Sequence, residues 1–296
     1  MVSAATISAV EAVSEAAAAW ENQSPVERGL AVCARDGVRL FHREWGSGQA
    51  VLFVHSWALN HTIWNYQIQA LAAHGLHCIA FDRRGHGRSD PAATGYDMDT
   101  LADDLAAVID TLGLRNLVLV GHSMGGGEII RYLARHGSAK ISKVVLIAPT
   151  TPFVMKTDDN PYGAPKEYFE TRRAEWMDDF PKWIEDNKLP FFTPDTSPAM
   201  MEWIVAEMRN SHLPTIMACN YAFVETDLRP DLAKVDRPTL ILQGDKDASA
   251  PLEFTGRRTA AGIAGAVLKV YREGPHAIFL THRKQVNQDI LDFISA

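Results

Sequence analysis

The sequence has few cysteines and no long apolar run, and both facts narrow its function. Its 296 residues include three cysteines, Cys33, Cys78 and Cys219, none of them in a CxxC pair. This spacing argues against a disulfide framework or a zinc site and is typical of a reducing compartment, so we expect a cytoplasmic protein. No apolar run is long enough to span a bilayer. The net charge of -7 argues against nucleic acid or an anionic membrane as the main partner.

The alanine-rich beginning of the chain differs from a signal peptide. It has no basic start, and Glu11 and Glu15 fall where the apolar centre of a signal peptide would lie. Apolar residues recur instead at helical spacing as far as Trp20. We therefore predict an N-terminal extension over residues 1–25, helical and packed on the rest of the protein or on a second subunit of a homo-oligomer.

Strand-like and helix-like segments alternate over residues 26–148 and again over residues 233–296. Apolar segments of strand length end near Val54, Phe81, Val120 and Ile147, and later near Gln243 and Tyr271. Segments with helical spacing lie between them, and a helix is expected around residues 252–263. Asp36-Gly37 predicts a hairpin at the start. The pattern predicts an α/β fold with a mostly parallel central sheet and helices on both faces.

Residues 149–232 interrupt this alternation after the sixth predicted strand. They contain repeated prolines, six of the nine methionines and three of the seven tryptophans. Helical spacing appears around Trp176 to Ile184 and around Met201 to Met208. Most of these side chains are better interpreted as ordinary helical core. As a set they favour a helical cap with an adaptable apolar pocket.

A serine stands between glycines directly after the apolar segment that ends at Val120. Gly121-x-Ser123-x-Gly125 fits the nucleophile elbow, a tight strand-to-helix turn that exposes a serine hydroxyl. A Cβ at either glycine would collide with a neighbouring strand or helix. The alternative is a glycine-rich loop with an incidental serine. The flanking segments and the partners below favour a catalytic serine.

A serine hydroxyl needs a base to remove its proton and a carboxylate to orient that base. In hydrolases of this architecture the chain order is serine, acid, histidine, each after a strand. Among eleven histidines, His276 alone lies between a late strand and the final helix; we interpret the others as structural or surface residues. Asp247 follows the preceding strand and is preferred as the acid, with Asp245 as its rival.

The oxyanion of a tetrahedral intermediate needs two aimed N–H donors. One donor should be the backbone of Met124, directly after the nucleophile, and the other should come from the loop after the third strand. The sequence therefore predicts an oxyanion hole formed by the N–H groups of Met124 and Trp57.

Several motifs resemble one branch of the α/β-hydrolase superfamily, the cofactor-free haloperoxidases and aryl esterases. They are residues 53–57, 81–90, 121–128 and 274–276, with the sequences FVHSW, FDRRGHGRSD, GHSMGGGE and GPH. The similarity extends from about Val38 to Phe293. In this branch the triad acid stands before a proline at the spacing of Asp247 and Pro251, which supports Asp247 over Asp245.

The resemblance implies a serine esterase for small or aryl esters, without metal, haem or other cofactor. Members of the branch often also perform perhydrolysis, and some open lactam rings. By analogy Phe223 and Ser249 would face the acyl pocket, and Ala58 would enlarge the substrate site. The chain departs from the family pattern at Ser56 and Ala277, where glycine is usual, and at Ala58, where proline or leucine is common. The departures at Ser56 and Ala58 are expected to affect perhydrolysis more than esterase activity.

The sequence thus predicts a carboxylesterase that acts on a small-molecule ester through an acyl-enzyme intermediate. One alternative keeps the triad and changes the bond to a lactone, lactam or amide. A second alternative is a ligand receptor that uses the hydrolase fold with little turnover. Haloalkane dehalogenases and epoxide hydrolases are disfavoured because they carry aspartate where this chain has Ser123.

Overall fold

The computed structural model describes residues 31–296, and within them eight strands form one sheet. Its spatial order is β1-β2-β4-β3-β5-β6-β7-β8. The first two pairings, β1 with β2 and β2 with β4, are antiparallel, and all later neighbours are parallel. The strands are β1 (Ala31–Cys33), β2 (Arg39–Trp45), β3 (Gln49–Val54), β4 (Leu76–Phe81), β5 (Leu117–His122), β6 (Ile141–Ile147), β7 (Thr239–Gly244) and β8 (Val267–Tyr271).

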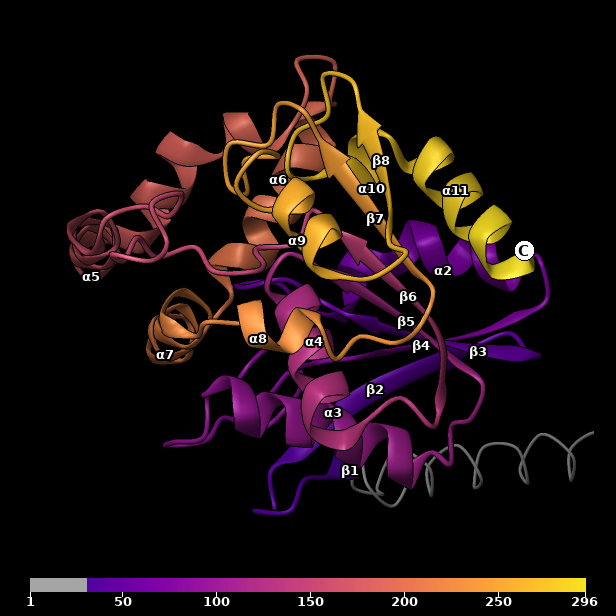
Figure 1. Cartoon of the computed structure of the whole chain (residues 1–296). Helices are drawn as coiled ribbons and strands as arrows, with labels where there is room; N and C mark the ends of the chain where they lie inside the picture. The colour runs from indigo at the N-terminus through magenta and orange to yellow at the C-terminus, as the bar shows by residue number, and fades with distance from the viewer. Residues whose placement is uncertain (1–30) are drawn as a thin grey trace, which may run out of the picture.

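Helices cover both faces of the sheet, as the alternation predicts (Figure 1). One face carries α3 (Met98–Thr111), α4 (Met124–His136), α8 (Arg229–Leu232) and α9 (Gly256–Gly262). The other face carries the 3-10 turn η1 (His61–Trp64), α2 (Asn65–Ala72), α10 (Ile278–Thr281) and α11 (Arg283–Ser295). The helix expected over residues 1–25 lies outside the described residues.

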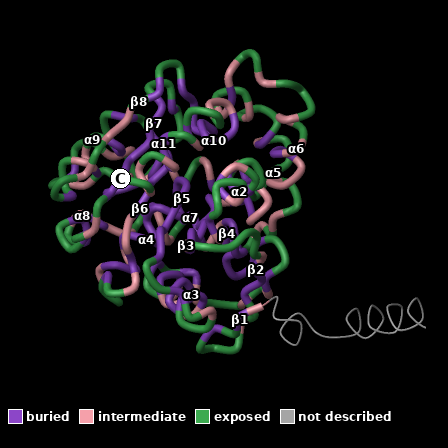
Figure 2. Tube along the Cα trace, turned by 90° about the vertical axis from the view of Figure 1, so that its right-hand side faces the viewer, coloured by how far each residue is buried: buried purple, intermediate pink, exposed green. Residues whose placement is uncertain are grey.

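The central strand β5 explains why the sheet needs both layers. Leu117 and Leu119 pack in the core cluster formed with α3 and α4, whereas Val118 and Val120 pack in the cluster formed with α2 and α11. Since alternate side chains of a strand face opposite sides, a strand without polar residues must be covered twice. In Figure 2 the strands are accordingly buried along most of their length, while exposed residues concentrate in the connections.

The hairpin predicted at Asp36-Gly37 joins β1 to β2. Gly37 adopts a φ of 87°, a left-handed conformation that costs glycine little. The turn is closed by hydrogen bonds from Ala34 N to Val38 O at 2.8 Å and from Gly37 N to Ala34 O at 3.0 Å. The hairpin prediction is confirmed.

Between β6 and β7 the chain is mainly helical. This segment contains α5 (Lys166–Asn187), the 3-10 turn η2 (Leu189–Phe191), α6 (Pro198–Arg209) and α7 (Leu213–Glu225), followed by α8. α5 is kinked at Asp179, two residues before Pro181, which cannot donate a backbone hydrogen bond. The helices expected from the spacing around Trp176 and Met201 are present as α5 and α6. The division into a core and a cap remains a prediction.

Two helices differ from what the sequence patterns indicate. α7 was not predicted, because its apolar residues face two directions: Cys219 packs in the core beneath the sheet and Ile216 packs among residues of α5 and α6. The helix expected over residues 252–263 begins only at Gly256. Before it the chain forms turns, with Phe254 N and Thr255 N both donating to the carbonyl of Pro251. Over residues 31–296, no helix has the length and apolarity that crossing a membrane requires.

Candidate active site

Ser123 lies at a strained turn between β5 and α4. Its φ and ψ are 54° and -119°, outside the conformations that L-residues adopt freely. The turn is held by its neighbours on the sheet: Ser123 N donates to Ile147 O of β6 at 3.0 Å. Strain of this kind persists only where the surrounding structure imposes it, and it clusters at functional sites.

The glycines around Ser123 make this turn sterically possible. A Cβ on Gly121 would stand 2.7 Å from the Ile129 side chain and 2.8 Å from the backbone of Gly125. A Cβ on Gly125 would stand 2.4 Å from the carbonyl oxygen of Val54, at the end of β3. The first turn of α4 therefore rests directly on the backbone of β3. This confirms the steric reason inferred for the Gly-x-Ser-x-Gly spacing.

The loops after β7 and β8 bring Asp247 and His276 together. His276 Nδ1 lies 2.8 Å from Asp247 Oδ2, and both side chains are buried. Asp247 also accepts hydrogen bonds from the backbone N–H groups of Ser249 at 2.9 Å and Ala250 at 2.7 Å. An ionised carboxylate that accepts these bonds fixes the proton of the imidazole on Nδ1. Nε2 is then left free to act as a base.

The rival carboxylate takes a different position. Asp245 is exposed, and its backbone N–H donates to the carbonyl of Tyr271 at 3.1 Å. The hydrogen bond to His276 is made by Asp247.

His122, next to the candidate nucleophile, supports the loop of His276. Its Nε2 donates to the backbone carbonyl of His276 at 3.0 Å, and the two rings lie 4.8 Å apart. Burial lowers the pKa of His122 well below its ordinary value, and the nearby His276 adds to the shift. His122 therefore stays neutral. This agrees with its interpretation as a structural residue packed beside the sheet.

The two backbone amides expected to bind an oxyanion have no acceptor of their own. Within residues 31–296, neither Trp57 N nor Met124 N donates a hydrogen bond. Met124 begins α4, whose positive dipole end adds to the attraction for an anion. The indole of Trp57 is anchored separately, because its Nε1 donates to Ile216 O of α7 at 2.8 Å.

The family pattern has glycine where this chain has Ser56, yet Ser56 does not adopt a left-handed backbone conformation. The left-handed backbone falls two residues later, on Ala58 with a φ of 57°. Ala58 is fully buried against residues of α5, α6 and α7, and it is not among the residues that line the cavity beside Ser123 and His276. The predicted role of Ala58 in enlarging the substrate site therefore has no support in this geometry, because its side chain packs among residues of α5, α6 and α7.

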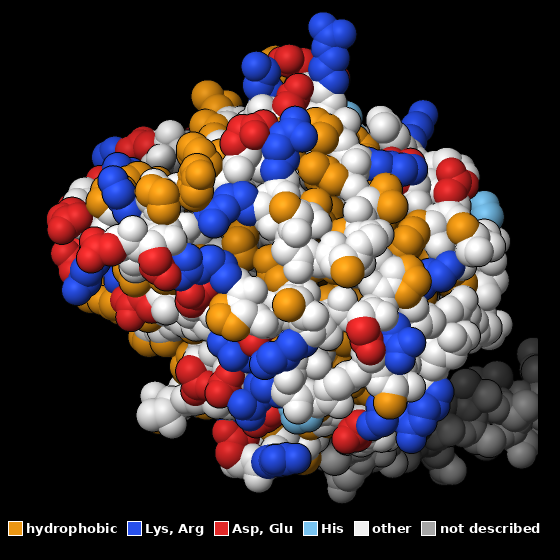
Figure 3. Space-filling view, in the orientation of Figure 1, with side chains coloured by type: hydrophobic (Ala, Val, Ile, Leu, Met, Phe, Trp, Pro, Cys, Tyr) orange, Lys and Arg blue, Asp and Glu red, His pale blue; other side chains and the backbone are white. Residues whose placement is uncertain are grey.

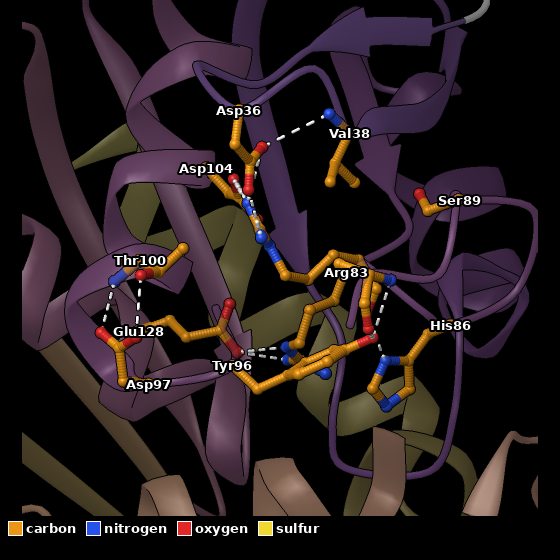
Figure 4. A network of polar contacts seen from close by, with 12 residues as sticks. Asp36, Val38, Arg83, His86, Ser89, Tyr96, Asp97, Thr100, Asp104 and Glu128 are labelled. Atoms are coloured by element: carbon orange, nitrogen blue, oxygen red, sulfur yellow. Dashed lines mark hydrogen bonds and ion pairs between the residues drawn. The ribbon is translucent and has the colours of Figure 1, made fainter. Parts of the chain in front are cut away.

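A buried ion pair supports this loop and was not identified from the sequence (Figure 4). Arg83, after β4, donates from Nε to Glu128 of α4 at 2.6 Å, and both side chains are 1% exposed. The same guanidinium donates to the carbonyls of His55 at 2.6 Å and Ser56 at 3.3 Å. Burial raises the pKa of Glu128, and the charge of Arg83 opposes that shift. The pair thus connects α4 to the loop that carries Trp57.

His55 completes this connection. Arg83 N donates to His55 Nε2 at 2.9 Å, so the ring proton lies on Nδ1, which donates to Ser56 O at 2.7 Å. Burial and the charge of Arg83 hold the pKa of His55 well below its ordinary value and lower that of the neighbouring His86 to about 3. The only sequence signal for this network is a charged Arg83 and a charged Glu128 close to two apolar strands, since buried charges need partners.

Ser123 and His276 open into one cavity of about 440 Å³. Its walls come from loops at the carboxyl ends of the strands and from the helices between β6 and β7. They include Ser56, Trp57, Thr150 and Ser249 from the loops and Trp176, Val205, Asn220 and Phe223 from the helices. Of the three predicted substrate-binding residues, Phe223 and Ser249 line the cavity and Ala58 does not. Within the described residues Ser123 Oγ makes no hydrogen bond.

The mouth of the cavity is aromatic. Tyr162, Tyr168 and Phe254 line it while remaining 52%, 51% and 46% exposed. In Figure 3 hydrophobic side chains gather at the upper left, over the helices between β6 and β7. The described residues contain no group of three or more histidine, cysteine or acidic side chains placed to hold a metal ion. The cavity is suited to a largely apolar organic molecule.

The sheet order and the serine turn are those of an α/β hydrolase. A family model described as the alpha/beta hydrolase fold matches residues 49–283, and the chain belongs to that family.

Its relatives narrow the family to a branch. A non-heme chloroperoxidase from Kitasatospora aureofaciens is 37% identical over 276 residues, which cover 90% of this chain and 100% of the relative. A bifunctional esterase/perhydrolase from Acinetobacter calcoaceticus is 35% identical, covering 89% of this chain and 98% of the relative. Among solved structures, an esterase from Exiguobacterium antarcticum has a TM-score of 0.87 at 32% identity, covering 90% of this chain and 99% of that one. The resemblance to the haloperoxidase and esterase branch is confirmed.

The buried neutral histidines predict how stability depends on pH. The folded-state pKa of His86 lies below the ordinary value, so between about pH 6.5 and pH 3 the unfolded chain binds a proton that the folded chain does not. Stability should therefore fall as the pH is lowered through this window. Each such histidine contributes a slope of about 1.4 kcal/mol per pH unit.

Urea unfolding at several pH values between about pH 7 and pH 5 measures this slope. In His86→Gln the slope of stability against pH should be smaller than in wild type by the contribution of one histidine, about 1.4 kcal/mol per pH unit. His74→Gln should keep the wild-type slope, because His74 is exposed. Equal slopes for wild type and His86→Gln would contradict the assignment of a neutral, buried His86.

Proposed function

We propose that the protein is a serine hydrolase that cleaves small or aryl carboxylic esters through an acyl-enzyme intermediate. The observation that carries the proposal is the pair His276 and Asp247, 2.8 Å apart, with His276 and Ser123 on the same apolar cavity. Supporting it, relatives covering nearly the whole chain include proteins named as an esterase and an esterase/perhydrolase.

The first half of the reaction forms the acyl-enzyme. Ser123 Oγ attacks the ester carbonyl carbon while His276 Nε2 takes its proton, and Asp247 stabilises the resulting imidazolium. The carbonyl oxygen becomes an oxyanion that accepts hydrogen bonds from the N–H groups of Trp57 and Met124. When the intermediate collapses, the carbon–oxygen bond to the alcohol breaks and the alcohol leaves with the proton from His276.

The second half releases the acid. Water attacks the acyl carbon, His276 takes one of its protons, and Ser123 regains a proton as the carboxylic acid departs. The acyl group occupies the cavity wall that includes Phe223 and Ser249. Lactones and lactams would follow the same steps with the leaving group tethered to the acyl group; the names of the relatives favour esters.

Perhydrolysis is a second candidate function on the same acyl-enzyme. The Acinetobacter relative is named as a bifunctional esterase/perhydrolase, and it matches 89% of this chain. In this reaction hydrogen peroxide attacks the acyl carbon in place of water, and a peracid leaves. No further residue is needed, because His276 can take the proton from hydrogen peroxide as it does from water.

Replacing the nucleophile tests the proposal. Ser123→Ala should reduce hydrolysis of p-nitrophenyl esters, from acetate upward, to background, because the acyl-enzyme cannot form. Its fold should persist, since the backbone bond from Ser123 N to Ile147 O remains. Ser138→Ala, two residues beyond the end of α4, is the matched control and should hydrolyse the esters at the wild-type rate.

Circular dichroism verifies that both variants are folded. Substantial residual turnover by folded Ser123→Ala would remove Ser123 as the nucleophile. If wild type cleaves no ester in the series, the lactone, lactam and receptor alternatives take precedence over an esterase.

The two aspartates after β7 provide a second test. Asp247→Asn should lower kcat for an accepted ester on the order of a thousandfold or more, because the amide no longer fixes the tautomer of His276. Asp245→Asn removes the same charge two residues earlier, at an exposed position, and should leave kcat within about twofold. Steady-state kinetics of both variants measure these changes in kcat. Similar losses in the two variants would contradict the choice of Asp247.

A further inference from the structure

One helix wall of the cavity carries a polar side chain that the proposed mechanism does not use. Asn220 of α7 is 3% exposed and lines the cavity. Its Oδ1 accepts a hydrogen bond from Arg173 Nε of α5 at 2.7 Å. Within residues 31–296 its Nδ2 donates to no acceptor, and this nitrogen is not among the buried atoms shielded from solvent.

The orientation of this amide follows from its partner. A guanidinium only donates, so the atom of Asn220 that faces Arg173 must be the oxygen. Arg173 is buried, its guanidinium stacks 3.5 Å above the ring of Tyr221, and it pairs with Glu225 at 3.5 Å. Because Arg173 is fixed in this way, the amide cannot reverse without losing its hydrogen bond. The NH₂ group is therefore presented to the cavity.

Asn220 belongs to the helix that anchors the side chain of Trp57, whose backbone N–H is an expected oxyanion donor. The indole of Trp57 donates to the carbonyl of Ile216, one turn before Asn220 on the same helix. Phe223, which also lines the cavity, follows less than one turn after Asn220. Trp57, Asn220 and Phe223 thus form one continuous side of the cavity, so a group bound there lies alongside the acyl part of the substrate.

Resting on the proposed esterase function, we propose that Asn220 determines specificity by donating to an oxygen on the acyl chain of the substrate. The preferred class is then an oxo-acyl ester, whose second carbonyl pairs with the Asn220 NH₂ group. In a mostly apolar cavity, a plain alkyl chain leaves this donor unpaired, which disfavours binding. Discrimination by such a group arises from the penalty on the substrate that lacks the oxygen.

Matched esters test the proposal. The substrates are p-nitrophenyl hexanoate and its 4-oxo and 5-oxo derivatives, which differ by one carbonyl oxygen. In wild type, kcat/KM for one of the oxo esters should exceed that for hexanoate by roughly three- to tenfold, the effect of one net hydrogen bond. In Asn220→Leu, a variant of similar volume, this advantage should disappear while hexanoate is still cleaved.

Two further variants test whether the preference for the oxo ester depends on the Asn220 NH₂ group. Asn220→Asp keeps the bond to Arg173 and nearly the same shape but removes the donor, so it should lose the oxo preference even if Asn220→Leu folds poorly. Asn187→Leu is the control, because Asn187 Nδ2 already donates to Trp183 O at 2.8 Å, and it should keep the wild-type ratio.

The possible outcomes separate this inference from the function on which it rests. If wild type cleaves the esters and the ratio of oxo ester to hexanoate is the same in wild type and in both Asn220 variants, this inference is wrong and the esterase proposal stands. If wild type cleaves none of the esters, the proposed function is wrong and this inference falls with it.

Discussion

The structure depends on the close contact between the first turn of α4 and the end of β3. At Gly125 the two backbones are so near that a Cβ would lie 2.4 Å from Val54 O. This contact forces Ser123 into its left-handed conformation and directs the start of α4 toward the cavity. At the same point a Cβ on Gly125 would lie 2.8 Å from His55 O, in the loop that carries Trp57. A strained residue at this point is stable because the sheet on either side is fully buried and cannot yield.

The ion pair of Arg83 and Glu128 stabilises the same contact, between α4 and the chain that follows β3. Glu128 belongs to the helix that begins with Met124, and Arg83 holds the carbonyls just before Trp57. Buried ion pairs contribute little net stability, since desolvation offsets their attraction, and their value lies more in fixing one arrangement. Here the arrangement is the separation of two backbone amides that the proposed mechanism directs at a single oxyanion. Catalysis gains most from donors that need no reorganisation when charge develops.

Most of the fold was predictable from the sequence, because local patterns determine it. Apolar runs marked the strands, and the Gly-x-Ser-x-Gly spacing marked the turn at Ser123. The resemblance to the haloperoxidase and esterase branch, in which the triad acid precedes a proline at this spacing, supported Asp247 over Asp245, and the structure pairs Asp247 with His276. Three features were missed because they depend on contacts between distant segments: α7, whose apolar residues face two partners; the pairing of Arg83 with Glu128; and the orientation of Asn220 by Arg173. Ala58 was assigned to the cavity, yet its side chain packs among residues of α5, α6 and α7.

The central claim is that Ser123 is an activated nucleophile, and covalent labelling tests it most directly. The protein is treated with diisopropyl fluorophosphate, which transfers its phosphoryl group to an activated serine with loss of fluoride. Mass spectrometry then locates the label, and ester hydrolysis is followed in parallel. The account predicts one phosphoryl group per chain, on Ser123, with activity lost in proportion to labelling. Full activity in a labelled protein, or a label on another residue that tracks the loss of activity, would contradict it.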